Sequence, residues 1–169
     1  MTRAAVKPAP PLFLDLDGVL ADFDRGVEAL LHRRPDQLPP GLMWATLAKA
    51  PEFYATLEMM EDAQALWDFC KAFKPRILTG LPRGTWAEPQ KRIWVANMLG
   101  RDVEVITGMS RDKHKFSGPG HVLVDDRAKL REAWEKAGGI FIHHRSAERS
   151  IAELKRIGFG RRAAKARTR

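Results

Sequence analysis

Residues 11–23 read PLFLDLDGVLADF, and this stretch decides the fold class. An apolar run of this length, bounded by proline and glycine, is typical of a buried strand in a parallel sheet. Asp15 and Asp17 stand within that run and at its end. Because a carboxylate in apolar surroundings is costly to desolvate unless it is paired or bound to a metal, the stretch predicts a first strand that leads into a polar site.

Four more apolar runs resemble this first strand in length and in their content of Val, Ile, Leu or Phe, and helical patterns separate most of them. The predicted strands cover residues 11–17, 75–79, 103–107, 121–126 and 139–144, and the predicted helices cover 61–73, 87–100, 130–137 and 147–157, the last with Ser146 as N-cap. Strands that alternate with helices predict an α/β fold with a doubly wound, Rossmann-like parallel sheet. Trp67, Trp94, Trp134 and Cys70 fall on apolar helix stripes and are predicted to lie in the core.

The interval between the first two strands is too long for a single crossover. We therefore expect residues 22–60 to form a small helical insert, broken into short helices by Pro35, Pro39, Pro40 and Gly41. The predicted organisation is a flexible lead at residues 1–10, one domain at residues 11–160 that carries this insert, and a basic tail at residues 161–169.

Composition narrows the class of protein. The net charge is +8, and the five positive charges of residues 161–169 account for most of it, leaving +3. We expect the tail to be solvated, with weak nucleic-acid contact as the alternative. The single cysteine excludes an internal disulfide and a cysteine-based metal site. No apolar run reaches the roughly 18 residues that a membrane helix needs, so a cytoplasmic protein without membrane contact is expected.

Polar residues follow four of the predicted strands. Asp15-Leu16-Asp17 ends the first strand, Thr79-Gly80 the second and Asp125-Asp126 the fourth, and Lys113 lies in the loop after the third. In doubly wound sheets, ligands bind at the carboxyl ends of the strands. Several carboxylates at one edge would require a cation, and Mg²⁺ fits best because its ligands are hard oxygens.

The order of these residues resembles the motif order of the haloacid dehalogenase-like phosphatases. DLDGVLADF (15–23) is similar to the first motif of that superfamily, ILTG (77–80) to the second, SRDK (110–113) to the third and VLVDDR (122–127) to the fourth. The nearest likeness is to the small 5′(3′)-deoxyribonucleotidases, since Asp22-Phe23 and FYATLEMMEDA (53–63) resemble their first motif and their cap. The resemblance implies a helical cap after the first strand.

The resemblance also implies the role of each residue. Asp15 is expected to be the nucleophile that forms an aspartyl-phosphate, and Asp17 the general acid and base. Thr79, Gly80 and Lys113 are expected to hold the phosphate, with Lys115 as an alternative to Lys113. The expected Mg²⁺ ligands are Asp15, the Asp17 carbonyl oxygen and Asp126, with Asp125 behind them.

The insert contains four aromatic residues for which core packing and ligand stacking are equally plausible, namely Phe23, Trp44, Phe53 and Tyr54. Flat aromatic faces suit a nucleobase, so a (deoxy)nucleoside monophosphate is the leading substrate hypothesis. The alternatives are a phosphatase for another small phosphate ester, a receiver-type phosphoacceptor domain, and a non-catalytic module that binds nucleic acid or phosphate. His143 and His144 are expected to be structural, because adjacent strand residues point to opposite faces.

Overall fold

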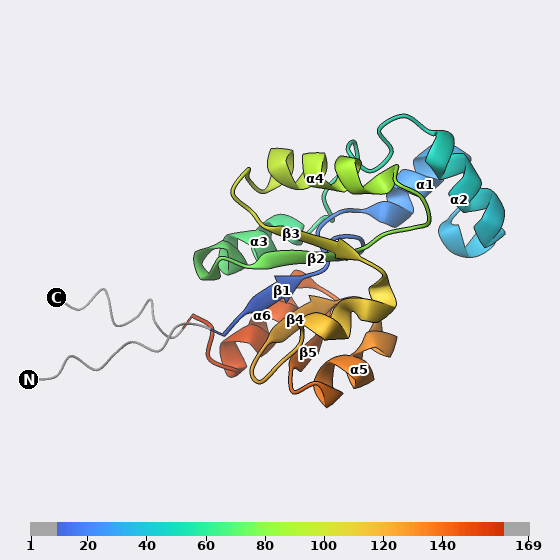
Figure 1. Cartoon of the computed structure of the whole chain (residues 1–169). Coiled ribbons are helices and arrows are strands. Elements are labelled where there is room, and N and C mark those ends of the chain that lie inside the picture. Colours follow the sequence, from blue (N-terminus) through green and yellow to red (C-terminus); the bar gives the residue numbers. More distant parts are fainter. Residues whose placement is uncertain (1–9, 161–169) are drawn as a thin grey trace, which may run out of the picture.

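The computed structural model describes residues 10–160, which fold around one five-stranded parallel sheet with helices on both faces (Figure 1). The strands are β1 (Leu12–Leu14), β2 (Arg76–Gly80), β3 (Val105–Gly108), β4 (Val122–Asp125) and β5 (Ile140–His143). Their order is β3-β2-β1-β4-β5. The predicted parallel α/β sheet is therefore confirmed, with strands shorter than the apolar runs. Except for Pro10, the predicted lead and the basic tail lie outside the described residues.

Strand β1 lies at the centre of the sheet. Its Phe13 aligns with Arg76 of β2 on one side and with Leu123 of β4 on the other. Because β1 has a strand on each side and helices above and below, all three of its residues are buried. In a parallel sheet the carboxyl ends of neighbouring strands meet at one edge, so the residues that follow β1, β2 and β4 are brought together.

The two faces of the sheet bury different side chains. Leu12 and Leu14 of β1 join one core cluster, and Phe13 joins the other with Trp134, as the alternation of side chains along a strand requires. Helices α3 (Ala63–Cys70), α4 (Ala87–Met98) and α6 (Ala147–Arg156) contribute to the first cluster, and α5 (Arg131–Lys136) to the second. The predicted core residues Trp67, Trp94, Trp134 and Cys70 are all buried.

Side-chain caps fix the start of two helices. Ser146 accepts a hydrogen bond from the backbone N–H of Arg149 at 3.2 Å, which confirms the predicted N-cap of α6. Asp62 also accepts a hydrogen bond from the N–H of Ala147 at 2.6 Å, tying the start of α6 to the start of α3. At the start of the insert, Asp22 caps α1 through the N–H of Arg25 at 3.1 Å.

Between β1 and α3 lie the helices α1 (Phe23–Leu31) and α2 (Pro40–Lys49), separated by the short 3₁₀ helix η1 (Pro35–Gln37). Figure 1 shows α1 and α2 together at one end of the molecule, at the right of the view. Two hydrogen bonds fasten the end of this segment to α4: Trp94 Nε1 donates to the Leu57 carbonyl at 2.8 Å, and the Tyr54 N–H donates to Gln90 Oε1 at 2.8 Å. The predicted helices after the first strand are therefore present.

Three further segments are short 3₁₀ helices. η2 (Lys71–Phe73) extends α3, η3 (Ser110–Phe116) follows β3, and η4 (Ala128–Leu130) precedes α5. Within residues 10–160 no helix combines the length and apolar character needed to cross a membrane.

Candidate active site

The ends of β1, β2 and β4 and the 3₁₀ helix η3 build the floor of the site, by which we mean Asp15, Asp17, Thr79, Lys113 and Asp125. Asp15 directly follows β1 and is held by a hydrogen bond from its N–H to the Val124 carbonyl at 2.9 Å. Asp125 is the last residue of β4 and is fully buried. Asp15 and Asp125 each place a carboxylate oxygen within 4.8 Å of one another and of Asp126. Three of the predicted acidic residues therefore form one cluster.

Lys113 lies in η3 directly against this cluster. Its Nζ is 2.7 Å from Asp15 Oδ1 and 2.7 Å from Asp125 Oδ2, and the side chain is almost completely buried. Burial on its own lowers the pKa of Lys113, but Asp15 and Asp125 overcome that effect and raise it above its ordinary value. Lys115 is exposed and pairs with Asp112 at 3.1 Å. The structure thus places Lys113, and not Lys115, at the carboxylates.

Asp17 has a lysine of its own that the sequence analysis did not single out. Lys91 Nζ of α4 donates to Asp17 Oδ2 at 2.7 Å, to Thr79 Oγ1 at 3.0 Å and to the Gly80 carbonyl at 2.8 Å. The same ammonium lies 4.4 Å from the centre of the Tyr54 ring. Lys91 is completely buried, so these contacts replace all of its hydration.

The signal for Lys91 is present in the helical pattern. Ala87, Lys91, Trp94 and Val95 are the four buried residues of α4 and share one helix face. A lysine on such a face is unusual, because lysine is almost never fully buried unless it is paired. The place of Lys91 on the apolar stripe therefore indicates a buried lysine, and a buried lysine needs a partner such as a carboxylate.

The Asp17 carboxylate is only half satisfied. Its side chain is 27% exposed, yet the Oδ1 atom is buried and has no hydrogen-bond partner among the described residues. Burial raises the pKa of Asp17, Lys91 opposes that effect, and the nearby Asp15 adds to it, with the net shift upward. A raised pKa keeps a carboxyl group protonated nearer to neutral pH, as a general acid requires.

Two glycines allow the close approach of chain segments around the floor. Gly18 has a φ of +78°, and a Cβ there would collide with the carboxylate of Asp126. At Gly80 a Cβ would collide with the hydroxyl of Ser110. Side chains at these two positions would therefore push Asp126 and Ser110 away from the floor.

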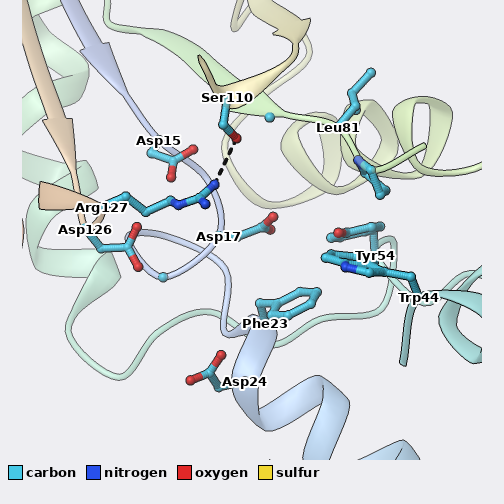
Figure 2. A pocket seen from close by; sticks show the side chains of 13 residues that line it. Asp15, Asp17, Phe23, Asp24, Trp44, Tyr54, Leu81, Ser110, Asp126 and Arg127 are labelled. Carbon is cyan, nitrogen blue, oxygen red and sulfur yellow. Dashed lines mark hydrogen bonds between the residues drawn. The ribbon is translucent and has the colours of Figure 1, made fainter. Parts of the chain in front are cut away.

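An aromatic wall, formed by Phe23, Trp44 and Tyr54, faces the floor. These residues line a pocket of about 360 Å³ together with Asp15 and Asp17 (Figure 2). The Phe23 ring lies 5.6 Å from Trp44 and 6.0 Å from Tyr54, centre to centre. The pocket is also lined by Gly18, Asp24, Gly80, Leu81, Pro82, Ser110, Asp126 and Arg127.

The structure does not bring every predicted pocket residue to this wall. Phe53 is buried, packs edge-on against Phe23 and Tyr54, and lines a different hollow beside Arg25. Thr79, Lys113 and Asp125 do not line the pocket either, but lie buried beneath it. Asp24, Ser110 and Arg127 line it although the sequence analysis did not single them out as pocket residues.

The acidic cluster fits a divalent cation. Burial, Asp15 and Asp125 raise the pKa of Asp126 to about 7, and burial and Asp15 raise the pKa of Asp125. Three carboxylates around the single ammonium of Lys113 carry excess negative charge, which a metal ion would relieve. All three offer hard oxygen ligands. Asp15 and Asp126 are thus suited to hold such an ion, with the buried Asp125 beside them in the same cluster.

The two histidines at the end of β5, His143 and His144, take no part in the cluster. His143 Nε2 lies 3.0 Å from the Asp126 carbonyl, and the buried His144 pairs with Ser150 Oγ at 2.8 Å. Both contacts are structural, as expected from their alternation on the strand.

A search of curated proteins finds a relative that is 30% identical over 133 residues, covering 76% of this chain and 73% of the relative. With the sheet order and the strand-end carboxylates, this relative shows that the chain belongs to the haloacid dehalogenase-like hydrolases. The relative is a protein of Vibrio phage KVP40 named "Putative 5'(3')-deoxyribonucleotidase".

Solved structures with a similar course of the chain include a hydrolase from Streptococcus pneumoniae TIGR4, with 13% identity and a TM-score of 0.48 over 89% of this chain and 98% of that chain. A "putative haloacid dehalogenase-like hydrolase" from Burkholderia xenovorans LB400 has 15% identity and a TM-score of 0.49 over 90% of each chain. No family model matches the sequence.

Proposed function

We propose that this chain is a magnesium-dependent phosphatase that hydrolyses deoxynucleoside monophosphates through a phosphorylated aspartate. The observation that carries the proposal is the pairing of two carboxylates, Asp15 and Asp17, with three aromatic side chains around one pocket of about 360 Å³. The name of the phage relative supports the same class of substrate.

In the first step, an oxygen of the ionised Asp15 attacks the phosphorus atom and the ester P–O bond breaks. Lys113 engages Asp15 Oδ1, which leaves Oδ2 as the attacking atom. Asp15 needs no separate base because a carboxylate is already a nucleophile. The buried Thr79 hydroxyl and Lys113 ammonium lie beneath the phosphate and stabilise the charge on its oxygens.

Asp17 moves the proton in both steps. It donates a proton to the leaving oxygen in the first step, for which its raised pKa is suited. It then accepts a proton from the water that attacks the aspartyl-phosphate, so that Asp15 and inorganic phosphate are released. Lys91 holds the Asp17 carboxylate near Thr79 throughout, because it donates a hydrogen bond to each of them.

Magnesium would be held by Asp15, Asp126 and the Asp17 carbonyl oxygen, with Asp125 supporting the cluster from its buried position. When bound, it would offset the negative charge of the cluster and of the phosphate. Asp125 itself stays paired with Lys113 and accepts a hydrogen bond from the Arg127 N–H at 2.8 Å.

The aromatic wall would select the substrate. Base–aromatic stacking is worth roughly 1–3 kcal/mol per base, and Phe23, Trp44 and Tyr54 present rings to the same pocket as the catalytic carboxylates. Hexose phosphates would require several hydrogen-bonding side chains, whereas the side chains of the wall are mainly apolar. We therefore assign the wall to the nucleobase and the floor to the phosphate.

The test is phosphate release by the purified protein in magnesium, from p-nitrophenyl phosphate and from a panel of deoxynucleoside 5′- and 3′-monophosphates. Asp15→Asn is the control for contaminating phosphatase, since it removes the nucleophile and preserves the shape. Release from nucleotides that disappears in Asp15→Asn supports the proposal. If p-nitrophenyl phosphate is hydrolysed and no nucleotide is, the protein is a phosphatase and the assignment of a nucleotide substrate is wrong.

A further inference from the structure

A second hollow of about 280 Å³ adjoins the catalytic pocket, and we call it the basic hollow. It is lined by Arg111, Arg127 and Lys129 and shares Leu81, Ser110 and Arg127 with the catalytic pocket. Arg127 Nη1 donates to Ser110 Oγ at 3.1 Å, as Figure 2 shows, and this contact lies where the two hollows meet. A ligand in the catalytic pocket could therefore extend past Arg127 without leaving the protein surface.

The two hollows have opposite charge. The catalytic pocket is lined by Asp15, Asp17, Asp24 and Asp126, whereas no carboxylate of the described residues lines the basic hollow. Between residues 10 and 160, no carboxylate forms an ion pair with Arg111, Arg127 or Lys129. Some other cations in this part of the chain are paired, for example Lys115 with Asp112 and Arg131 with Glu135. The hollow is distinguished by the three cations that line it together without a carboxylate among its lining residues in the described part of the chain.

The side chains of Arg111, Arg127 and Lys129 line one hollow without a carboxylate partner, so their positive charges repel one another. An anion bound between them would relieve that repulsion. Phosphate is the anion that best matches the set, because arginine guanidinium groups bind its oxygens in pairs and lysine supplies a point charge. A sugar hydroxyl or a base edge would leave the three charges uncompensated. The hollow therefore has the chemistry of a phosphate subsite next to the catalytic phosphate site.

We propose that the basic hollow binds a second phosphate group of the substrate. This inference rests on the proposed function and extends its substrate class, because it predicts that nucleotides with a second phosphate bind more tightly than the monophosphates. The second phosphate belongs either to a nucleoside 3′,5′-bisphosphate or to the first phosphodiester of a short 5′-phosphorylated DNA strand. In both cases, phosphate oxygens would contact Arg111 and Lys129. The two sources are distinguished by comparing a bisphosphate with a 5′-phosphorylated dinucleotide.

The experiment compares three substrates in magnesium: a deoxynucleoside 5′-monophosphate, the matching 3′,5′-bisphosphate and the matching 5′-phosphorylated dinucleotide. We expect at least one of the two substrates that carry a second phosphate to have a KM about tenfold below that of the monophosphate, because charge-assisted hydrogen bonds from the hollow would hold that phosphate. The gain should shrink as salt is added. The substrate that shows it identifies the source of the second phosphate.

The decisive variant is Arg111→Gln with Lys129→Gln, because neither residue lines the catalytic pocket. It should remove the gain and leave the monophosphate reaction unchanged. Lys136→Gln with Arg149→Gln removes the same charge from exposed positions outside the hollow and should preserve the gain. Equal KM values for all three substrates, or equal losses in both double variants, would overturn the proposal.

Binding to the inactive Asp15→Asn protein separates this proposal from the proposed function. Calorimetry should show tighter binding of the bisphosphate or dinucleotide than of the monophosphate, and adding the Arg111→Gln and Lys129→Gln changes should abolish the difference. Monophosphate turnover without any preference for a second phosphate would reject the subsite and retain the nucleotidase. Turnover of none of the three nucleotides, with no binding of any, would reject both.

Discussion

The floor and the aromatic wall meet in one pocket, but the chain builds them differently. The acidic floor residues and Thr79 lie at or just after the ends of buried strands, and their positions are fixed by strand pairing and by the buried ammonium groups of Lys91 and Lys113. Wall residues come from the segment between β1 and α3, which is attached to α4 by hydrogen bonds at Tyr54 and Leu57. Changes to the floor should therefore affect every substrate, whereas changes to the wall should affect selectivity.

The largest effect is expected from Asp15→Asn. This change removes the nucleophile, so turnover of nucleotides and of p-nitrophenyl phosphate should fall by at least about a thousandfold, a modest part of the acceleration that enzymes typically achieve. The fold should survive because one charge of a crowded acidic cluster is lost and the shape is kept. Circular dichroism checks the fold, and Asp36→Asn, an exposed site far from the floor in sequence, is the control. Substantial residual turnover would refute the covalent route.

Metal removal should have an effect nearly as large. A chelator should abolish phosphatase activity, and added magnesium should restore it. Calcium should restore the activity poorly, because its bonds to oxygen are longer and its coordination number is higher. Full activity in excess chelator would contradict the assignment of the acidic cluster.

Asp126→Asn tests the same cluster through stability. Because the pKa of Asp126 in the folded protein is about 7, above its ordinary value of 3.8, the folded state binds a proton more tightly than the unfolded state. Between pH 4 and pH 7, approximately the two pKa values, the free energy of unfolding of the metal-free protein should therefore fall as the pH rises. Asp126→Asn should flatten that dependence and raise the Tm near pH 7.5.

Thermal melts with and without magnesium measure both consequences. The Tm of the wild-type protein should rise when magnesium is added, because the ion binds only the folded state. The Tm of Asp126→Asn should rise by less. An equal gain in both proteins would show that Asp126 does not hold the ion.

Lys91→Met should have the next largest effect. Methionine fills the buried space without the ammonium, so Asp17 and Thr79 lose their shared donor. We expect the phosphorylation rate to fall roughly tenfold to a hundredfold, within the roughly 10²–10⁴-fold that general acid–base catalysis contributes. Rapid-quench measurement of the first turnover checks this, with Lys71→Met at an exposed ion pair as the control.

The pH profile adds a readout that a loss of packing would not change. Lys91 lowers the pKa of Asp17, opposing the upward effect of burial, so its removal should raise that pKa further. Since Asp17 must be protonated to act in the first step, the decline of the rate at high pH should move to higher pH in Lys91→Met. A profile that keeps its position would show that Lys91 does not act through Asp17.

The wall should give the smallest effect, and one confined to selectivity. Phe23→Leu keeps an apolar side chain but removes a ring that faces the pocket, and should lower kcat/KM for nucleotides by roughly 5- to 100-fold, given stacking energies of about 1–3 kcal/mol per base. Turnover of p-nitrophenyl phosphate should change little. Phe53→Leu is the matched control, because Phe53 packs against the same rings without lining the pocket. Equal losses in both variants would point to packing instead of substrate contact.

The floor could be predicted from sequence because chain topology places it. Parallel strands end at one edge, so Asp15, Thr79 and Asp125 had to meet there once the strands were recognised. The resemblance of SRDK to the third motif favoured Lys113 over Lys115, but both lie in one 3₁₀ segment, and only packing shows that the first is the buried one. Lys91 was missed because lysines in helices usually face water.

The wall was predicted only as a set of four candidate aromatic residues. Phe53 and Tyr54 are neighbours in sequence, and which of them faces the pocket depends on how their segment packs against α4. Ser110 and Arg127 reach the pocket through a loop contact between segments that are 17 residues apart. No local pattern encodes such a contact.

The most direct test of the division between floor and wall is an internal competition. A deoxynucleoside monophosphate and a hexose phosphate are mixed at equal concentration with wild-type enzyme and magnesium, and the ratio of their consumption rates gives the ratio of their kcat/KM values. We expect the nucleotide to be consumed at least about tenfold faster, a difference equal to about 1.4 kcal/mol and within reach of one stacking contact. Equal consumption, or faster loss of the hexose phosphate, would contradict it.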